Sequence, residues 1–330
     1  MARSSTDFKA VILAGGSGER FWPLSTSERP KQFLRVFGGE SLIRQSVTRL
    51  LGLVGFDDVY VVTSRDLVAA TRRELSEIPP ENIIGEPMRR DTGAAVALGV
   101  GAAGRTQKTV VGFFPSDQMV TDAKEFRRVV GRAVDLAAKG RRIATIGIRP
   151  TFPATGFGYV DPKSGRFVEK PDRRTASSYL KKGYLWNAGM FIASAATFRA
   201  AFLAHAPHLI PLAEGSTSAR SRDAYERLPR ISFDFAIMEK LGGVDVVPGD
   251  FGWDDVGSFA AFDTYFPHDS RGNVREGPCT VVESDSNICV ARSARISLLG
   301  VKNLVVVTTP DAVLVADKSR ISEMKKLFRR

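Results

Sequence analysis

Two hydrophobic patterns alternate over the first 150 residues. Short continuous apolar runs predict buried strands at 8–13, 59–63, 82–85, 109–114 and 143–148. Between them, apolar residues at helical spacing predict helices at 41–51, 66–77, 92–103 and 122–138. This alternation indicates βαβ units in an α/β fold, with a mostly parallel (mixed) sheet flanked by helices. Because such sheets bind ligands at the carboxyl ends of their strands, polar segments that follow strands are the candidates for function.

The pattern changes along the second half of the chain. Residues 150–260 are less regular, with strands expected at 157–160, 166–170 and 190–193, and helices near 175–182, 194–204, 221–228 and 234–241. After residue 270, short β-rich pieces are separated by turn residues, at 279–283, 288–291, 296–299, 303–308 and 312–316, before a basic helix at 320–330. We therefore expect two domains, 1–265 and a small β-rich, β-helix-like domain at 266–330 that ends in a helix.

Composition restricts the class of protein. Hydrophobic residues make up 43% of the 330 residues, which is ordinary for a globular protein. The net charge is +11, from 47 basic and 36 acidic residues, but the basic residues form scattered pairs, so no nucleic-acid partner is expected. The apolar runs are shorter than the ~20 residues that span a bilayer. With only Cys279 and Cys289, no signal segment and no CxxC, we expect a cytoplasmic protein without a membrane partner.

A glycine-rich loop follows the first strand. Glycines at 15, 16 and 18 let backbone N–H groups approach an anion, and Arg20 and Lys31 supply two cations. The loop lacks the GxxxxGK[ST] pattern of a Walker A motif and the GxGxxG pattern of a dinucleotide site. Taken alone the glycines also fit a tight turn, whereas the cations in this order indicate a triphosphate site.

The loop and later blocks resemble the sugar-phosphate nucleotidyltransferases, and among them the mannose-1-phosphate guanylyltransferases. The blocks stand in family order over about residues 8–260, and the tail is similar as well. They include Gly15-Gly-Ser-Gly-Glu-Arg-Phe-Trp-Pro-Leu-Ser25, Pro30-Lys-Gln-Phe33, Phe114-Pro-Ser-Asp-Gln118, Phe167-Val-Glu-Lys-Pro171, Trp186-Asn-Ala-Gly189, Ser232-Phe-Asp-Phe235 and Trp253-Asp-Asp-Val-Gly257. The resemblance implies a Rossmann-like fold of the nucleotidyltransferase type. It also implies the reaction GTP + α-D-mannose 1-phosphate = GDP-mannose + diphosphate.

This reaction needs no general base, because a phosphate monoester with a second pKa near 6 is already largely dianionic at pH 7. It needs in-line placement of two anions and neutralisation of their charge, which Mg²⁺ or another divalent cation such as Mn²⁺ helps to supply. The resemblance implies catalytic roles for Arg20, Lys31, Asp117 and Lys170. It implies metal ligation by Asp117 and Asp255, and the choice between Asp254 and Asp255 stays open.

The resemblance also implies two sets of binding residues. The nucleotide set is Leu13, Ala14, Gly15, Gly16, Ser17, Gly18, Glu86, Arg90, Asp91, Thr92 and Ser116. Guanine offers N1–H and N2–H₂ donors, which suit a carboxylate or backbone carbonyls, although Asp91 and Thr92 also fit helix capping. The sugar-phosphate set is Gly156, Gly158, Tyr159, Glu169, Lys170, Asn187 and Gly189. In a strand, Glu169 and Lys170 would point to opposite faces.

Two departures from the family pattern occur, Gln118 where many relatives carry His and Phe259 where Trp is frequent. Since the chain stops at residue 330, we expect the short, single-activity bacterial type without an isomerase domain. Strand edges in the tail favour a homodimer. The alternatives are a nucleotidyltransferase for another nucleotide or another hexose or heptose 1-phosphate, and a catalytically inactive regulator that binds nucleotide sugars.

Overall fold

The chain forms two compact units, each assembled from distant segments. The computed structural model describes residues 6–16 and 18–328. The larger unit consists of Met1–Gly15, Ile43–Ser116 and Val120–Trp253. The second unit consists of Gly16–Leu42, Asp117–Met119 and Asp254–Arg330. The division into domains at residues 265 and 266 stays a prediction.

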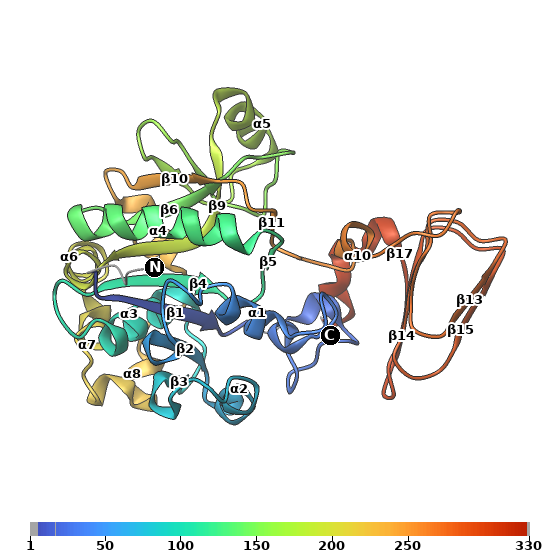
Figure 1. Ribbon diagram of the computed structural model, residues 1–330, viewed down its shortest axis with the longest axis horizontal. Helices are drawn as coiled ribbons and strands as arrows, with labels where there is room; N and C mark the ends of the chain where they lie inside the picture. Colours follow the sequence, from blue (N-terminus) through green and yellow to red (C-terminus); the bar gives the residue numbers. More distant parts are fainter. Residues whose placement is uncertain (1–5, 17, 329–330) are drawn as a thin grey trace. The chain divides into compact units, whose positions relative to one another are not determined.

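A mixed sheet forms the centre of the larger unit, in the order β10-β6-β9-β4-β1-β2-β3. Neighbours pair in parallel except β9, which runs antiparallel to both β4 and β6. The strands are β1 (Phe8–Ala14), β2 (Val59–Ser64), β3 (Ile83–Glu86), β4 (Val110–Pro115), β6 (Ala144–Ile148), β9 (Leu185–Ser194) and β10 (Asp245–Gly249), with β7 (Tyr159–Val160) and β8 (Phe167–Val168) joined beside β9. The predicted α/β class with a mostly parallel sheet is confirmed (Figure 1).

Helices cover both faces of this sheet. Neighbouring residues of β4 show it, because successive side chains of a strand point to opposite faces. Phe113 packs against Gly99 of α3 (Asp91–Ala103), where an added Cβ would lie 2.6 Å from the Phe113 ring. Phe114 faces the other way and contacts Phe126 of α4 (Ala123–Lys139), with ring centroids 6.2 Å apart. The small residues of α3 thus allow the helix to approach the sheet closely.

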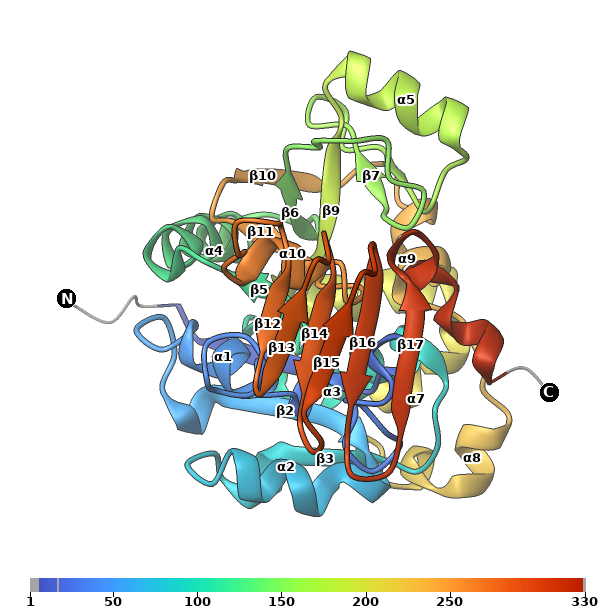
Figure 2. The same cartoon turned by 90° about the vertical axis from the view of Figure 1, so that its right-hand side faces the viewer.

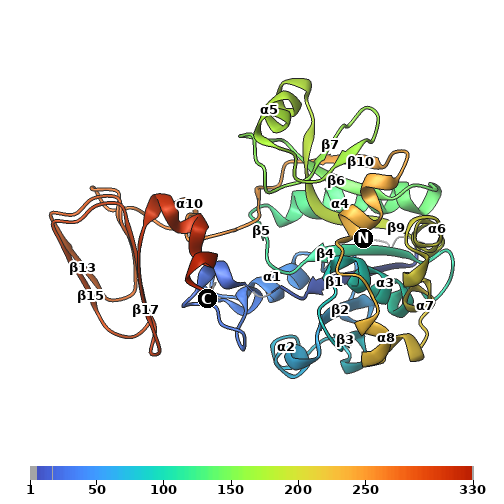
Figure 3. The ribbon, with the colours of Figure 1, turned by 180° about the vertical axis from the view of Figure 1, so that it is seen from behind.

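The remaining helices of the larger unit are short. They are α1 (Leu42–Thr48), whose first residue belongs to the second unit, α2 (Val68–Glu74), α5 (Arg173–Lys182), α6 (Ala195–His205), α7 (Ile210–Ala213), α8 (Arg222–Glu226) and α9 (Phe233–Ala236). Helix α7 packs against both α3 and α6 (Figure 3). The short strands β5 (Met119–Val120) and β11 (Trp253–Asp254) each contain a passage of the chain from one unit to the other.

Several elements of this unit differ from the prediction. The strand expected at 190–193 is longer, because β9 already begins at Leu185 and pairs through the Trp186-Asn-Ala-Gly block. The single helix expected at 234–241 is instead α9 followed by a 3₁₀ turn at Met238–Lys240. Strand β10 was not expected from the sequence, because Asp245 and Pro248 interrupt its apolar run.

The C-terminal part of the second unit is a rolled β structure, as predicted. One sheet has the order β12-β14-β16-β17 and a second pairs β13 with β15, all in parallel except β16 with β17 (Figure 2). The strands are β12 (Val274–Glu276), β13 (Cys279–Val282), β14 (Ile288–Ala291), β15 (Ile296–Leu299), β16 (Leu304–Thr308) and β17 (Val313–Asp317), preceded by α10 (Ala261–Tyr265). The helix expected at 320–330 is a 3₁₀ helix over Lys318–Leu327.

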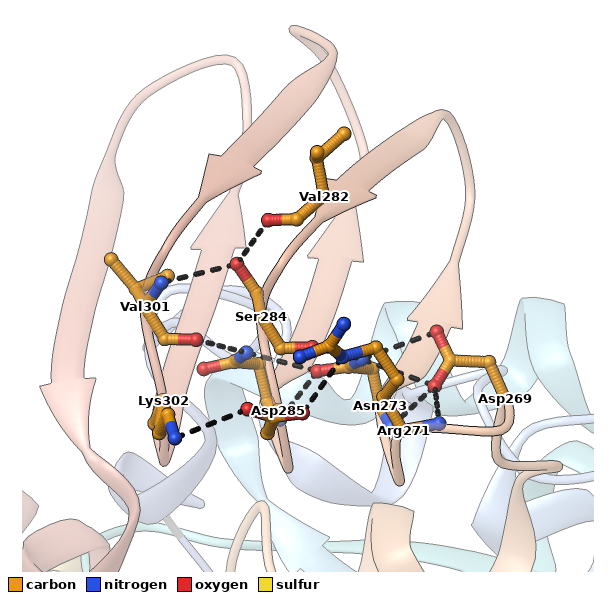
Figure 4. Close-up of polar contacts among 9 residues, drawn as sticks. Asp269, Arg271, Asn273, Val282, Ser284, Asp285, Val301 and Lys302 are labelled. Carbon is orange, nitrogen blue, oxygen red and sulfur yellow. Dashed lines mark hydrogen bonds and ion pairs between the residues drawn. The ribbon is translucent and has the colours of Figure 1, made fainter.

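Two buried asparagines join successive coils of this β structure (Figure 4). Asn273 Oδ1 accepts hydrogen bonds from the backbone N–H and the side-chain amide of Asn287, at 3.0 and 2.9 Å. The side-chain amide of Asn287 also donates to the Val301 carbonyl at 3.2 Å. Their side chains thus satisfy backbone groups that the turns between strands leave unpaired.

The core of the second unit also includes residues from the N-terminal half of the chain. Phe21 and Phe37 are buried with Phe259 and Phe262, and the Phe21 and Phe259 rings lie 5.3 Å apart. The glycine-rich loop and the segment that follows it are thereby anchored to residues more than 200 positions later. Among residues 6–16 and 18–328, no helix combines the length and apolar character needed to cross a membrane.

Candidate active site

The predicted nucleotide residues of the larger unit gather at the carboxyl edge of its sheet. Leu13 and Ala14 end β1, Glu86 ends β3, and Ser116 directly follows β4. The Ser116 N–H donates to the Leu13 carbonyl at 3.1 Å, which ties the exits of β1 and β4 together. This is the edge at which parallel sheets bind ligands.

Glu86 is a buried carboxylate beside the start of the glycine loop. An added Cβ on Gly15 would lie 3.8 Å from Glu86 Oε2. Glu86 Oε1 has no hydrogen-bond partner within the described chain. Burial raises the pKa of Glu86 to about 8, opposed by the charge of Arg89 and reinforced by that of Asp91. A carboxylate buried without a donor is costly, so this group is suited to a ligand that brings N–H donors.

The segment Arg90–Thr92 ties the start of α3 to two other helices. Arg90 donates to the Tyr225 and Glu226 carbonyls of α8, at 2.7 Å each. Thr92 Oγ1 accepts from the Phe233 N–H of α9 at 2.8 Å. Asp91 has a φ of 63° and accepts from the Thr92 N–H at 2.7 Å. A non-glycine residue at positive φ is held there by its surroundings, so this segment is fixed in place.

The predicted sugar-phosphate residues also lie in the larger unit. A strand over 166–170, with Glu169 and Lys170 on opposite faces, was expected from the sequence, and this prediction is wrong. Strand β8 ends at Val168, and Lys170 takes a φ of 42°, which turns the chain and ends the alternation of side chains. The turn brings Lys170 Nζ 2.5 Å from Glu169 Oε1. Burial lowers the pKa of Lys170, but the hydrogen bond and charge of Glu169 raise it on balance.

Gly158 lies directly against Glu169. An added Cβ on Gly158 would lie 2.6 Å from Glu169 Oε2, so the carboxylate occupies the space beside this glycine. Gly156 is exposed, with no atom near the position of an added Cβ. Tyr159 is fully buried and donates its hydroxyl to the Ala154 carbonyl at 3.0 Å, which holds the preceding loop. Gly189 has a φ of 71°.

Two acidic residues beside this group were not among the sequence candidates. Asp234 Oδ1 accepts from the Asn187 side-chain amide at 3.2 Å. Glu239 Oε1 accepts from the Glu169 N–H at 2.7 Å. Both stand in the block Ser232-Phe-Asp-Phe235 and the Met238-Glu239 pair that follows it, which carry part of the resemblance but suggested no role. Because both residues are far from Glu169 in the sequence, the sequence did not predict that they lie beside it.

In the second unit, Gly18 positions the glycine loop against Lys31. Gly18 has a φ of 65°, and an added Cβ would lie 2.4 Å from the Lys31 backbone nitrogen. Its carbonyl accepts from Ser25 Oγ at 2.5 Å. Gly16 is exposed and has space around it, while Ser17, also predicted to bind nucleotide, lies outside the described residues.

The structure brings together the predicted catalytic and metal residues of the second unit. The buried Lys31 donates from Nζ to Asp117 Oδ2 at 2.9 Å and to the Asp255 carbonyl at 2.8 Å. Arg20 Nη2 lies 3.9 Å from Asp255 Oδ2. Burial raises the pKa of Asp255, Lys31 lowers it, and the negative charge of Asp117 raises it again. Two carboxylates and two cations therefore share one small region.

The neighbouring aspartate, Asp254, has a different environment. Its Oδ1 accepts from the Val256 N–H at 2.6 Å and so stabilises the turn in which Val256 has a φ of 46°. Asp255 instead lies against Arg20, and an added Cβ on Gly257 would lie 3.1 Å from Asp255 Oδ2. Of the two, Asp255 is the one whose side chain faces the charged cluster.

The cluster suits a divalent cation that binds phosphate. Mg²⁺ is held by one or two carboxylates together with phosphate oxygens and water, and Asp117 and Asp255 provide such a pair of oxygen ligands. Their mutual repulsion, which contributes to the raised pKa of Asp255, would be relieved by a cation. Within the described residues there is no larger group of His, Cys, Asp and Glu that could form a cage around a metal.

Comparison with known proteins agrees with this geometry. The sequence model of the nucleotidyl transferase family matches residues 9–271. The chain belongs to the nucleotidyl transferase family. Residues 277–330 match a mannose-phosphate isomerase/GMP-like β-helix domain. The family resemblance and the fold that it implied are both confirmed.

Individual relatives of this nucleotidyl transferase are similar over nearly its whole length. The mannose-1-phosphate guanylyltransferase of Escherichia coli K12 is 34% identical over 345 residues, which cover 96% of this chain and 72% of that protein. A mannose-1-phosphate guanylyltransferase of Klebsiella pneumoniae is 34% identical with the same coverage. A crystal structure described as a mannose-1-phosphate geranyltransferase from Thermus thermophilus superposes with a TM-score of 0.88 at 34% identity, covering 98% of both chains.

Proposed function

We propose that this nucleotidyl transferase makes GDP-mannose and diphosphate from GTP and mannose 1-phosphate. The names of its relatives support the reaction and the sugar. The observation that carries the choice of nucleotide is Glu86, a buried carboxylate with an unpartnered oxygen at the carboxyl edge of the sheet. The N1–H and N2–H₂ groups of guanine are adjacent donors that match the two oxygens of a carboxylate.

Other bases fit Glu86 less well. Adenine presents one exocyclic amine beside an acceptor, so it matches only the protonated acid, and an ionised Glu86 would meet a lone pair and lack a second donor. A site built to hydrogen-bond a ligand rejects an analogue that lacks the donor, because the buried group is then unpaired. The segment Arg90–Thr92, fixed by α8 and α9, would support the same end of the nucleotide.

The triphosphate would be bound through the glycine loop, Arg20 and Lys31. Gly16 and Gly18 leave the backbone accessible to phosphate oxygens, and the two side chains add a forked and a point cation. Asp117 and Asp255 would hold Mg²⁺ or Mn²⁺. Such a cation, when bound, neutralises charge that builds up on the phosphate oxygens during transfer.

The sugar phosphate attacks the nucleotide α-phosphate without a protein base, since its oxygen is already ionised at neutral pH. The task of the protein is placement and neutralisation of charge. Lys170, whose side chain is 54% exposed, would hold the sugar phosphate, while Glu169 would accept from sugar hydroxyls. Gly156 and Gly189 would leave space for the ring, and Gly158 for the Glu169 carboxylate.

Replacement of Glu86 tests the choice of base. The wild-type protein is expected to use GTP at least tenfold better, by kcat/KM, than inosine triphosphate, which lacks the N2 amine. Glu86→Gln should remove most of this difference. Asp66→Asn, a change of an exposed acid in the same unit, should leave it unaltered. Equal discrimination in wild type and Glu86→Gln would contradict the role of Glu86.

We further propose a cytoplasmic homodimer that associates through the C-terminal β structure. Strand β17 is an edge strand within the described sheets, and its Val313 and Val315 are each 62% exposed. Exposed apolar edge strands favour pairing with a second copy. Sedimentation velocity at micromolar concentration tests this, with Val315→Lys as the variant expected to give monomer. A wild-type monomer would contradict the proposal.

A further inference from the structure

The side chain of Asp234 lies in the sugar-phosphate group of the larger unit and has acceptor capacity to spare. One oxygen, Oδ1, accepts from the Asn187 amide at 3.2 Å. A carboxylate has about four lone-pair positions, so this hydrogen bond leaves others available. The residue as a whole is half-buried.

The position of this carboxylate is fixed from two sides. Asn187 Oδ1 accepts from the Gly189 N–H at 3.1 Å, which sets the orientation of the amide and aims Nδ2 at Asp234. The preceding residue, Phe233, is fully buried and donates its N–H to Thr92 Oγ1 at 2.8 Å. Asn187 therefore serves as a positioning residue, with only one amide hydrogen left for a ligand.

The charges around Asp234 favour a ligand that brings hydrogen-bond donors. Glu169 and Asp91 both raise its pKa through their negative charge, and Lys170 opposes them. Glu239 Oε1 already accepts a hydrogen bond from the Glu169 N–H. Burial is the largest cause, and the pKa of Asp234 is raised to about 7. Hydroxyl donors satisfy carboxylates that are crowded in this way.

We propose that Asp234 is a specificity-determining residue that accepts hydrogen bonds from ring hydroxyls of the sugar phosphate, next to Glu169. This inference rests on the proposed function and adds to it. The two carboxylates differ: Glu169 forms an ion pair with Lys170, whereas Asp234 accepts a hydrogen bond from the neutral Asn187 amide. Asp234 is thereby the acceptor that depends most on the hydroxyls of the bound sugar.

A cycle that combines substitution with deoxy sugars tests the contact. The kcat/KM is measured for mannose 1-phosphate and its 2-, 3- and 4-deoxy analogues, with wild type, Asp234→Ala and Asp234→Asn. We expect at least one deoxy analogue to lose about tenfold in wild type and to lose little further in Asp234→Ala, because the contact is already absent. The KM for the sugar phosphate should rise about tenfold in both variants, with the KM for GTP within twofold.

Asp223→Asn, at an exposed aspartate of α8, is the matched control and should behave as wild type. Equal losses from every deoxy sugar in wild type and Asp234→Ala would overturn the contact. A fall in the melting temperature with KM for GTP and sugar raised together would also overturn it, because that result marks a purely structural residue. Absence of any turnover in wild type would instead contradict the proposed function itself.

Discussion

Lys31 Nζ lies 2.9 Å from Asp117 Oδ2 and 2.8 Å from the Asp255 backbone carbonyl. The lysine is buried, so its charge is compensated by these two residues rather than by water. Residues separated by 86 and 224 positions are thereby joined in one cluster of the second unit. This cluster is where we expect a divalent cation and the phosphate groups to bind.

Three aspartates should differ in their effect on metal binding. Asp117→Asn and Asp255→Asn should each weaken Mn²⁺ binding at least tenfold and lower kcat by about 10³-fold, since each removes a proposed ligand. Asp254→Asn should keep Mn²⁺ affinity within threefold, because Asp254 accepts from the Val256 N–H. Electron paramagnetic resonance of free Mn²⁺ measures binding directly. Weaker binding in Asp254→Asn than in Asp255→Asn would reverse the assignment.

Two glycines of the loop should respond differently to alanine. Gly18→Ala forces a Cβ to within 2.4 Å of the Lys31 backbone at a φ of 65°, so it should lower stability by about 2 kcal/mol or more and abolish activity. Gly16→Ala meets no atom within 4 Å, so the melting temperature should stay within about 1 °C of wild type. If the loop binds phosphate, Gly16→Ala should still raise the KM for GTP. An unchanged KM would remove Gly16 from the phosphate site.

The buried Glu86 predicts a pH dependence of stability. Its pKa is about 8 in the folded protein and near 4.5 when exposed, so the folded state retains the proton. The retained proton stabilises the fold fully below pH 4.5, and this stabilisation is lost as the pH rises to 8. Relative to wild type, Glu86→Gln should therefore gain stability over this window, by up to about 5 kcal/mol. Denaturant unfolding at pH 5 and pH 8.5 measures the difference.

Guanine binding should be linked to the same proton. If guanine donors bind ionised Glu86, GTP affinity should increase from pH 6.5 to 8 in wild type, with release of a proton. Calorimetry in buffers of different ionisation enthalpy reports the proton count. The triphosphate titrates in both proteins, but Glu86→Gln lacks the carboxylate. The variant should therefore not show the increase in GTP affinity that comes from Glu86. The same increase in both proteins would argue against contact between Glu86 and the base.

The asparagines of the C-terminal β structure should contribute to stability rather than to catalysis (Figure 4). Asn273→Ala leaves the Ser284 carbonyl and both Asn287 donors without their partner, so it should cost about 2–3 kcal/mol. Thr280→Ala, at an exposed position of the same structure, should cost under about 0.5 kcal/mol. Thermal unfolding of both variants gives the comparison. Equal melting temperatures would mean that the asparagine bonds are replaced by water.

Local signals accounted for much of the fold but not for its long-range associations. The apolar runs at 8–13 and 109–114 predicted β1 and β4, because buried strands need continuous apolar residues. Strand β10 was not predicted, because Asp245 and Pro248 interrupt its apolar run. An edge strand tolerates such residues. No local pattern could show that the segment 16–42 packs with residues beyond 254.

The candidate site shows the same limit. Lys31, Asp117 and Asp255 were predicted from motifs, and the structure places them together. Asp234 was missed, because its proximity to Asn187 arises only when α9 packs against the sheet. Likewise, the turn at Lys170 depends on a positive φ that the alternating pattern of a strand does not predict.

Release of diphosphate across a grid of substrates measures the proposed reaction itself. Four nucleoside triphosphates are combined with the 1-phosphates of mannose, glucose, galactose and N-acetylglucosamine, in the presence of Mg²⁺. We expect GTP with mannose 1-phosphate to give by far the highest kcat/KM. A different dominant pair would contradict the assignments of base and sugar while keeping the chemistry. No release in any combination would contradict the enzymatic function.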